Sequence, residues 1–553
     1  MRRFFKGFAF LAAAATVMLG GSLDVSAAGV RDVFDAKYYA DSYEDLKALY
    51  GYDEAALYNH YITCGLTEGR CASPVFNVAQ YRKNYEDLNQ VFGDDWDAYV
   101  NHYMNCGIAE GRTSDVISNK STGFNAWMID YEKLAELSGG NDETQWLASY
   151  ITNLAPTNRN KYTGFFEGYN LIFLTAEGFS PYAVRQDLTP TLYKMLHSSF
   201  VFNNYYVPLW RTSTSDGEYV NCTGLIPDGQ HSMKKSAGNN MAYTLPRFFA
   251  AEGVYSWGYH DHTLSYYDRH LTHPNLGYDF KASKPGDLSA EEWGNRLFVM
   301  EDPYAWPASD YNMMVATIPE YINAGRFHVY YMTVSGHMNY TFSGNRMARK
   351  NRDAVTGLDL SENGQAYIAC QIELDRALQY LLEQLELAGK LENTVICLSA
   401  DHYPYGMSQA QYEELAGKDL SGAMDMYRNG LILWNAGIQE PIIVNKACCS
   451  VDLLPTLLNL FGFNFDSRMY AGRDIFSDEE GLVIFNDLSF VSDTVAYNAK
   501  QQTAAWMTDL PQETQDAYMK AKQQDAADRY LFSAYILRNN YYDIVQQCVN
   551  TPR

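Results

Sequence analysis

Short apolar runs alternate with longer amphipathic stretches through the second half of the chain. Strand-like runs occupy residues 170–177 (NLIFLTAE), 327–336 (FHVYYMTVSG), 393–402 (NTVICLSADH), 430–436 (GLILWNA) and 481–486 (GLVIFN). Apolar positions at helical spacing lie between them, as in AYIACQIELDRALQYLLEQLELAGK at residues 366–390. Apolar strands that alternate with long helices predict a mainly parallel sheet covered on both faces, an α/β three-layer sandwich.

An internal repeat precedes this region. The segment Tyr38–Arg70 returns as Gln80–Arg112, and His60 and His102 set a period of 42 residues. The apolar spacing predicts two short helices per copy, in an all-α region over residues 31–113. His60, Cys64, His102 and Cys106 suggest a metal site, but packing residues repeated in each copy are the favoured interpretation. The repeats resemble helical modules of exported Gram-positive proteins, which implies contact with the cell wall; a spacer without a ligand is the alternative.

The extreme N-terminus has the pattern of a secretory signal. A basic start, an apolar run and the small residues VSA precede Ala28, which predicts a signal peptide over residues 1–27. We therefore expect an exported protein, with the segment either cleaved or kept as an N-terminal anchor. The remaining predicted boundaries are a linker and helical segment at 114–161, a catalytic domain at 162–499 and a C-terminal helical segment at 500–553.

Composition narrows the classes of partner. The formal net charge is −24 and the sequence pI is about 4.8, which argues against nucleic acid as a partner. A phosphate-bearing substrate must therefore be held locally, by a metal or by a few basic residues. The nine cysteines are an odd number with no C-x-x-C spacing, so a zinc ribbon is disfavoured, and Cys370 and Cys397 are expected in the core.

Candidate metal ligands follow three of the predicted strands. Glu177 comes after the first run, His337 after the second, and Asp401 and His402 after the third. Because ligands of open parallel sheets bind beyond the carboxyl ends of the strands, these side chains are expected at one edge. Carboxylate and imidazole ligands suit a divalent cation such as Mn²⁺ or Zn²⁺.

The segment RTSTSDGEYV, residues 211–220, offers a nucleophile for such a cation. A hydroxyl bound to a metal loses its proton more readily and becomes an effective attacking group. The segment passes from loop to predicted helix, with Ser215 or Asp216 as the cap, and helix-start N–H groups can receive a phosphoryl oxygen. The residues alone leave Thr212, Ser213, Thr214 and Ser215 as equal candidates.

Several ordered motifs resemble the lipoteichoic acid synthase group. They are NLIFLTAEGFSPY, LTPTLY, TSTSDGEY, YYDRHLTHPNLGYDF, VSGHMNYTF and LSADHYPYG, within residues 162–499. These exported phosphoglycerol transferases belong to the alkaline phosphatase and sulfatase superfamily. The resemblance implies one cation, Mn²⁺, bound by Glu177, Thr214, Asp401 and His402, with Thr214 as the nucleophile.

The same resemblance assigns a substrate site. His337 matches the family's headgroup-binding histidine, and in YHDHTLSYYDR the residues His260 and Arg269 match directly. His262 stands where the family has Asp, and Tyr267 where it has Trp. Arg269 is suited to a bidentate contact with phosphate.

The predicted function is phosphoglycerol transfer, or phosphodiester hydrolysis, on a glycerophospholipid or a teichoic-type polymer at the outer face of a Gram-positive envelope. Where the family has several membrane helices before the catalytic domain, this sequence has the predicted signal peptide and two helical repeats, and it contains no C/S-x-P-x-R motif of sulfatases. Two alternatives remain: a phosphatase or sulfatase-like hydrolase of the same superfamily, and an envelope-binding protein with a vestigial catalytic domain.

Overall fold

The computed structural model describes residues 30–73, 76–107, 112, 114, 122–229, 231–422, 424–438 and 440–549. The predicted signal peptide lies outside these residues. The chain divides into two compact units, on either side of the boundary between residues 119 and 120. Among the described helices, none combines the length and apolar character needed to cross a membrane.

The N-terminal unit consists of short helices around its own apolar cluster. After η1 (Val30–Val33), the first copy contains α2 (Ala36–Ser42), α3 (Glu44–Tyr50), α4 (Glu54–His60) and the π-helical turn η2 (Tyr61–Gly65). The second contains α5 (Val78–Asn84), α6 (Glu86–Phe92), α7 (Trp96–His102) and η3 (Tyr103–Gly107). The prediction of two helices per copy is wrong, because an extended tyrosine divides the first helix: Tyr43 has φ −135° and ψ 103°.

Each histidine of the repeats lies against a tyrosine of its own copy. Tyr39 Oη lies 3.0 Å from His60 Nδ1, and the equivalent atoms of Tyr81 and His102 are also 3.0 Å apart. The neighbouring cysteines of the motif, Cys64 and Cys106, are exposed. This geometry favours the packing interpretation, while binding of envelope components by the repeats stays a prediction.

The second unit is built on an eight-stranded sheet with the order β5-β4-β6-β1-β7-β8-β2-β9. Only β8 runs against the rest, since it is antiparallel to both β7 and β2 while the other pairs are parallel. The strands are β1 (Asn170–Ala176), β2 (Phe200–Phe202), β4 (Tyr255–Thr263), β5 (Asp279–Lys284), β6 (Phe327–Met332), β7 (Thr394–Ala400), β8 (Ile432–Trp434) and β9 (Ile442–Val444). The α/β sandwich predicted from the sequence is confirmed.

Neighbouring residues of β6 identify the helices on each face. Successive side chains of a strand point to opposite faces. Tyr330 Oη donates to Glu218 of α11 (Ser213–Thr223) at 3.1 Å, whereas Tyr331 Oη lies 2.9 Å from Thr317 Oγ1 of α16 (Asp310–Tyr321). On the α11 face lies α21 (Leu453–Leu460). On the other face α16 packs against the long helix α19 (Glu362–Leu387), which also contacts α10 (Pro190–Leu196).

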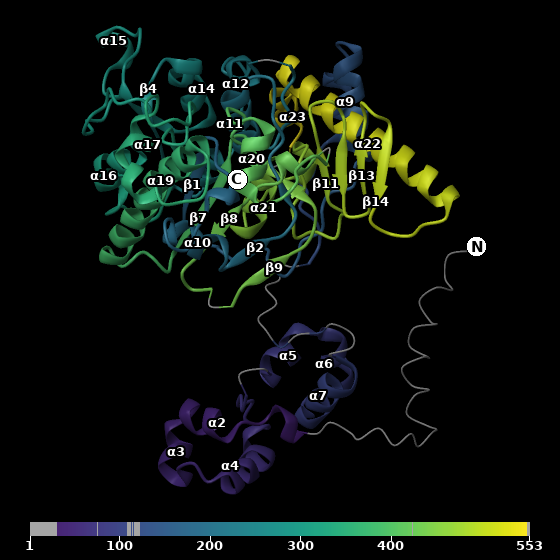
Figure 1. Cartoon of the computed structure of the whole chain (residues 1–553). Helices are drawn as coiled ribbons and strands as arrows, with labels where there is room; N and C mark the ends of the chain where they lie inside the picture. Colours follow the sequence, from purple (N-terminus) through teal and green to yellow (C-terminus); the bar gives the residue numbers. More distant parts are fainter. Residues whose placement is uncertain are drawn as a thin grey trace. The chain divides into compact units, whose positions relative to one another are not determined.

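Further helices complete the unit around these layers (Figure 1). They are α8 (Tyr131–Leu137), α9 (Asp142–Asn153), α12 (Ser232–Ser236), α13 (Leu245–Ala251), α14 (Arg269–Leu276), α15 (Ala290–Trp293), α17 (Arg346–Lys350), α18 (Arg352–Val355), α20 (Gln409–Ala416), α22 (Gln512–Arg538) and α23 (Tyr541–Cys548). Short 3₁₀ turns are η5 (Pro181–Ala183), η6 (Tyr266–Asp268), η7 (Asp425–Tyr427), η8 (Ser450–Asp452) and η9 (Ser467–Met469).

The run GLVIFN is expected in the parallel sheet, but it forms part of a different sheet. Its strand β11 (Leu482–Ile484) pairs antiparallel with β12 (Phe490–Ser492). Strand β12 pairs antiparallel with β13 (Val495–Asn498), which pairs antiparallel with β14 (Thr503–Trp506). Helix α22 lies beside this small sheet (Figure 1), and Tyr518 Oη on the helix is 2.7 Å from Ser492 Oγ on β12. A two-stranded pair, β3 (Tyr205–Tyr206) with β10 (Cys448–Cys449), is also separate from the main sheet.

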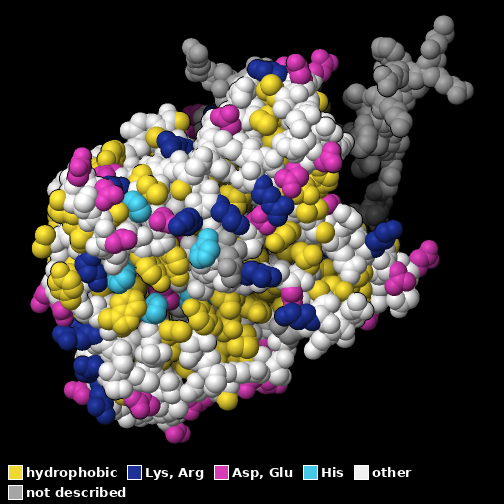
Figure 2. Space-filling view, turned by 90° about the horizontal axis from the view of Figure 1, so that it is seen from above, with side chains coloured by type: hydrophobic (Ala, Val, Ile, Leu, Met, Phe, Trp, Pro, Cys, Tyr) yellow, Lys and Arg dark blue, Asp and Glu magenta, His cyan; other side chains and the backbone are white. Residues whose placement is uncertain are grey.

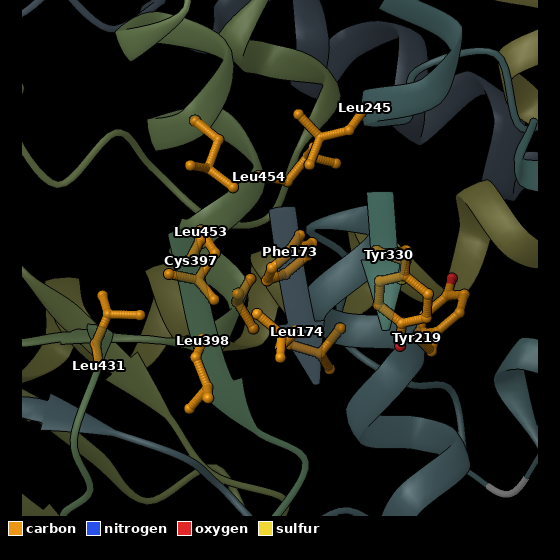
Figure 3. Close-up of a cluster of buried hydrophobic side chains, with 14 of the residues drawn as sticks. Phe173, Leu174, Tyr219, Leu245, Tyr330, Cys397, Leu398, Leu431, Leu453 and Leu454 are labelled. Carbon is orange, nitrogen blue, oxygen red and sulfur yellow. The ribbon is translucent and has the colours of Figure 1, made fainter. Parts of the chain in front are cut away.

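The core lies where the central strands meet these helices (Figure 3). Phe173 and Leu174 of β1 are fully buried beside Cys397 of β7 and Tyr330 of β6. Cys370 is also buried, as predicted, and all nine cysteines are unpaired. Strands buried on both faces explain the continuous apolar runs in the sequence.

Candidate functional site

Three strand ends come together at one edge of the sheet, as the sequence predicts. Strand β1 pairs with β6 on one side and with β7 on the other, so that Glu177, the turn carrying His337, and Asp401 follow adjacent strands. One ligand atom each from Glu177, Asp401 and His402 lies within 4.8 Å of the others, and all three residues are buried.

His402 directs its Nε2 toward the two carboxylates. Its Nδ1 lies 2.9 Å from the carbonyl oxygen of Tyr403, and because a carbonyl only accepts, Nδ1 must carry the proton. In the neutral ring Nε2 is then the unprotonated nitrogen. It lies 3.2 Å from Asp401 Oδ2 and 3.5 Å from Glu177 Oε1.

The two carboxylates are short of partners. Asp401 Oδ1 accepts from the backbone N–H groups of Gly178 and His402, each at 2.8 Å, but the buried Oδ2 has no hydrogen-bond partner in the described chain. Burial and the neighbouring Asp401 raise the pKa of Glu177 well above its ordinary value. Two buried carboxylate groups and an imidazole lone pair fit a divalent cation, which would neutralise them and occupy the orphaned oxygen.

Thr214 lies directly beside these atoms. Its Oγ1 is 3.2 Å from Glu177 Oε2 and 3.3 Å from His402 Nε2. A Cβ on Gly217, one turn along α11, would meet the Asp401 carbonyl oxygen at 2.4 Å. Glycine in T-S-D-G-E therefore allows the helix to approach the end of β7 this closely.

The predicted cap of this helix is wrong. The helix begins at Ser213, so that Ser215 and Asp216 lie in its first turn rather than ahead of it. Asp216 instead accepts from the backbone N–H groups of Thr212 at 2.8 Å and of Ser232 at 3.1 Å. Its buried carboxylate thereby joins the start of α11 to α12 and fixes where Thr214 stands.

Arg269, predicted to hold a phosphate, is engaged by a carboxylate. Its Nη2 and Nε donate to Glu218 Oε2 at 2.6 and 2.9 Å, and both side chains are buried. His273 Nε2 lies 3.2 Å from the other Glu218 oxygen. Burial works against the charged form of Glu218, but Arg269 and His273 outweigh it and hold the pKa of Glu218 below its ordinary value. Arg269 Nη1 makes no contact with Glu218 and lies 3.4 Å from both His260 Nε2 and the carbonyl oxygen of Tyr266.

A cavity of about 380 Å³ opens above Thr214. It brings together all the predicted substrate residues with the predicted nucleophile: its lining includes Glu177, Thr214, His260, His262, Tyr267, Arg269 and His337. Figure 2 shows histidine side chains lying among hydrophobic ones on the face seen from above. The volume is in the range of small-molecule sites, roughly 300–1,000 Å³.

The histidines of the cavity are neutral. Burial, followed by the Arg269 charge, lowers the pKa of His260 well below its ordinary value, and its Nδ1 lies 3.0 Å from the carbonyl oxygen of Met332. Burial and Lys284 lower the pKa of His262 to about 4, and burial lowers that of His337. At neutral pH the wall therefore offers imidazole hydrogen bonds without added charge.

Three aromatic residues of the cavity are not predicted from the sequence. The Trp306 ring lies between the rings of His262 and His337, with centroids 4.9 and 4.8 Å away, and Tyr266 and Tyr405 line the same space. Trp306 belongs to a loop without strand, helix or motif pattern, so nothing local in the sequence marks it. Tyr267 packs on Arg269, with the guanidinium carbon 5.3 Å from the ring centroid.

Comparison with known proteins identifies the family. The sequence profile described as Sulfatase matches residues 170–463, which is more than half of the chain and includes every site residue above. The chain belongs to the sulfatase family. It is thus a member of the alkaline phosphatase and sulfatase superfamily, as the motifs imply.

Curated relatives of this family member include lipoteichoic acid synthases. Lipoteichoic acid synthase 2 of Bacillus subtilis is 24% identical over 371 residues, covering 64% of this chain and 54% of the relative. The lipoteichoic acid synthase of Staphylococcus saprophyticus is 25% identical over 407 residues, covering 70% and 60%. The chain therefore spans little more than half the length of these relatives.

A solved structure supports the fold. The lipoteichoic acid synthase LtaP from Listeria monocytogenes superposes with a TM-score of 0.56 at 19% identity, covering 70% of this chain and 97% of that one. At this level of identity the superposition supports only the fold of this chain. The reaction that the chain catalyses has to be argued from its site.

Proposed function

We propose that the protein is a metal-dependent phosphoglycerol transferase or phosphodiesterase with Thr214 as its nucleophile. The observation that carries this proposal is the position of Thr214 Oγ1, 3.2 Å from Glu177 Oε2 and 3.3 Å from His402 Nε2 at the floor of the cavity. Similarity to lipoteichoic acid synthases supports a glycerol-phosphate substrate, on a lipid or a teichoic-type polymer.

Glu177, Asp401 and His402 would hold the cation, with Thr214 Oγ1 as a further ligand, and we propose Mn²⁺. A bound divalent cation favours the deprotonated hydroxyl and stabilises negative charge on the phosphoryl group. Thr214 Oγ1 gives up its proton and attacks phosphorus, the bond from phosphorus to the diacylglycerol or polymer oxygen breaks, and that departing oxygen takes up one proton, so that the proton count is unchanged. The glycerol-phosphoryl group is then esterified to Thr214.

In the second half-reaction an alcohol or water attacks the same phosphorus. The Thr214–phosphorus bond breaks, the hydroxyl is restored, and the attacking O–H group loses its proton. The neutral imidazoles of His260, His262 and His337 orient the glycerol hydroxyls, and Arg269 Nη1 contributes positive charge near the phosphate. Tyr267 keeps that guanidinium in place by stacking.

Turnover by variants at position 214 tests this proposal. Purified protein is supplied with Mn²⁺ and labelled phosphatidylglycerol, and release of diacylglycerol is measured. Thr214→Ala should lose at least about a thousandfold in rate, whereas Thr214→Ser, which keeps a hydroxyl, should retain measurable turnover. Undiminished release by Thr214→Ala would rule out this nucleophile.

Simple ester hydrolysis is a second candidate, because the matched family is that of sulfatases. The absence of a C/S-x-P-x-R motif from the sequence argues against sulfate esters, since Thr214 stands at the nucleophile position instead. Relative rates on a phosphodiester, a phosphomonoester and a sulfate ester separate the candidates. Fastest turnover of the diester is expected, and a preference for sulfate would contradict the transferase proposal.

A further inference from the structure

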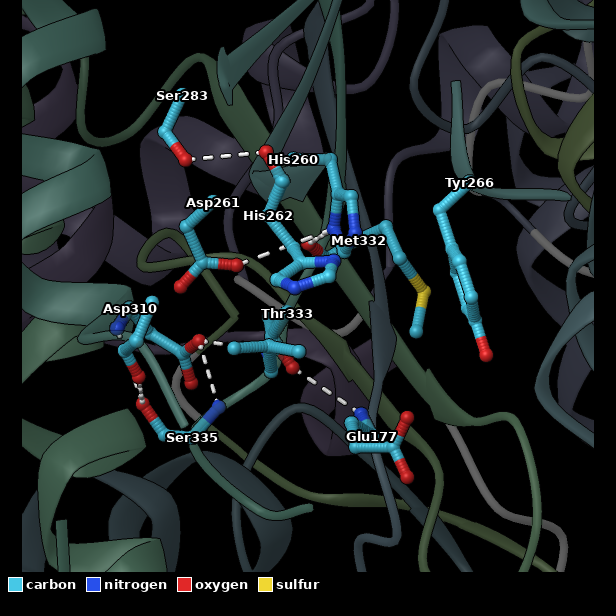
Figure 4. A network of polar contacts seen from close by, with 12 residues as sticks. Glu177, His260, Asp261, His262, Tyr266, Ser283, Asp310, Met332, Thr333 and Ser335 are labelled. Carbon is cyan, nitrogen blue, oxygen red and sulfur yellow. Dashed lines mark hydrogen bonds and ion pairs between the residues drawn. The ribbon is translucent and has the colours of Figure 1, made fainter. Parts of the chain in front are cut away.

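The buried carboxyl groups of Asp261 and Asp310 have no part in the mechanism above. Asp261 lies on β4 between His260 and His262, so its side chain points away from the face on which those two histidines line the cavity. Asp310 is the first residue of α16. Both side chains are fully buried, and Figure 4 shows the Asp261 carboxyl group directed toward that of Asp310.

Asp310 holds the turn that follows β6. Its Oδ1 accepts from the backbone N–H groups of Val334 at 2.8 Å and Ser335 at 3.1 Å, and its own N–H donates to Ser335 Oγ at 3.0 Å. Val334 lines the cavity, and its carbonyl accepts from the His337 N–H at 3.0 Å. The position of His337 therefore depends on how Asp310 is placed.

The same turn also reaches the metal-binding side chains. Thr333, next to Val334, accepts from the backbone N–H of Glu177 at 3.1 Å through Oγ1, and its own N–H donates to the Thr175 carbonyl at 3.1 Å. Figure 4 shows this path from Asp310 through the turn to Glu177. Asp310 thus supports both the histidine wall and the first candidate ligand.

Asp261 and Asp310 cannot both be ionised at low cost. Neither Asp261 oxygen, nor Asp310 Oδ2, has a hydrogen-bond donor among the described groups when both acids are taken as charged. His260 Nδ1 is 3.9 Å from Asp261, but that ring is neutral and its Nδ1 donates to a backbone carbonyl. Like charges buried together favour retention of one proton.

The directions of the two pKa shifts also favour one retained proton on this pair of carboxyl groups. Burial, with the adjacent Asp310, raises the pKa of Asp261 well above its ordinary value, and Lys284 on β5 opposes this as a smaller effect. Burial also raises the pKa of Asp310, but only to about 6, since Val334 and Ser335 donate hydrogen bonds to it. Asp310 is therefore the member of the pair that keeps the negative charge.

We propose that Asp261 is protonated at neutral pH and donates a hydrogen bond to the Asp310 carboxylate, which makes both of them positioning residues for the cavity. The hydrogen bond joins the strand that carries His260 and His262 to the turn that carries His337. The protonation state stands apart from the reaction, whereas the positioning role rests on the proposed function.

An infrared difference spectrum between wild type and Asp261→Asn at pH 7 tests the protonation state without any turnover. The carbonyl stretch of a protonated carboxylic acid is expected in wild type and should be lost in Asp261→Asn. Asp187→Asn, at an exposed ion-paired carboxylate, is the matched control and should leave that band intact. A carboxylic acid band that is equally strong in wild type and in Asp261→Asn would overturn the proposal.

Kinetics and metal counting test the positioning role. Asp261→Asn keeps a donor to Asp310, so KM for phosphatidylglycerol should stay within about twofold, while Asp261→Leu, which leaves Asp310 Oδ2 unpaired, should raise KM roughly tenfold. Equal effects of Asn and Leu would refute positioning through this hydrogen bond.

One Mn²⁺ per chain is expected. A second Mn²⁺ that is lost in Asp261→Asn would show that the two aspartates form a charged metal site instead. If wild type releases no diacylglycerol, the proposed function fails while the infrared result still decides the protonation.

Discussion

At the scale of single residues, the sequence predicts the position of a side chain well when that residue directly follows a strand. It predicts poorly which distant residue a side chain contacts. Glu177, Asp401 and His402 meet because parallel strands end at the same edge, which the apolar runs already indicate. Arg269 is different: its match to a motif predicts a phosphate contact, but in the folded chain two of its three nitrogens donate to Glu218. Such partner choices depend on tertiary packing that no local pattern contains.

The ion pair of Glu218 predicts a structural rather than catalytic defect on mutation. Glu218→Ala leaves the Arg269 charge buried without its partner, so the free energy of unfolding should fall by about 3–5 kcal/mol. Asp187→Ala, which removes an exposed partner of Arg185, should change it by less than about 1 kcal/mol. Urea unfolding measures both, and equal small effects would contradict a buried pair.

The pH dependence of this contribution has a defined sign. Because the folded-state pKa of Glu218 is lowered, its stabilisation is complete above the ordinary carboxyl value of 4.5 and is lost as pH falls below it. The difference in stability between wild type and Glu218→Ala should therefore shrink on acidification, as measured by the same urea titrations between neutral and acidic pH.

At the scale of elements, the alternation of strands and helices predicts the main sheet but not each strand's membership. The run GLVIFN is as apolar as the others, yet β11 forms part of an antiparallel sheet because the next strands follow after short turns. The start of α11 is also misplaced in the prediction. The sequence predicts Asp216 as a possible N-cap of this helix, whereas in the structure its carboxylate accepts hydrogen bonds from the preceding loop and from α12.

The close approach of α11 to β7 gives a prediction for Gly217. An added methyl group would meet Asp401 backbone atoms at 2.4 and 2.8 Å, so the helix must move and take Thr214 with it. Gly217→Ala should destabilise the fold by about 1–3 kcal/mol and reduce turnover roughly a hundredfold. Gly238→Ala, where no atom lies within 4 Å, is the control and should have little effect on either. Normal activity in Gly217→Ala would show that this contact does not position the nucleophile.

At the scale of the whole molecule, each of the two units has its own apolar core, and the candidate metal-binding group found among the described residues lies in the second unit. A ligand that binds only the folded state stabilises it, by about 2.7 kcal/mol at one hundred times its dissociation constant. Mn²⁺ should therefore shift only the calorimetric transition of the second unit. His402→Ala should abolish the shift, and a shift that survives this substitution would place the cation elsewhere.

The central claim is that Thr214 forms a covalent bond to the substrate's phosphorus. Arg211 and Lys234 delimit a tryptic peptide that contains Thr214, so the claim can be read from one fragment. Protein incubated with Mn²⁺ and phosphatidylglycerol is quenched in acid, digested and analysed by mass spectrometry. We predict a glycerol-phosphoryl adduct on Thr214 in wild type and none in Thr214→Ala; diacylglycerol release without that adduct, or with the adduct on another residue, would contradict the account.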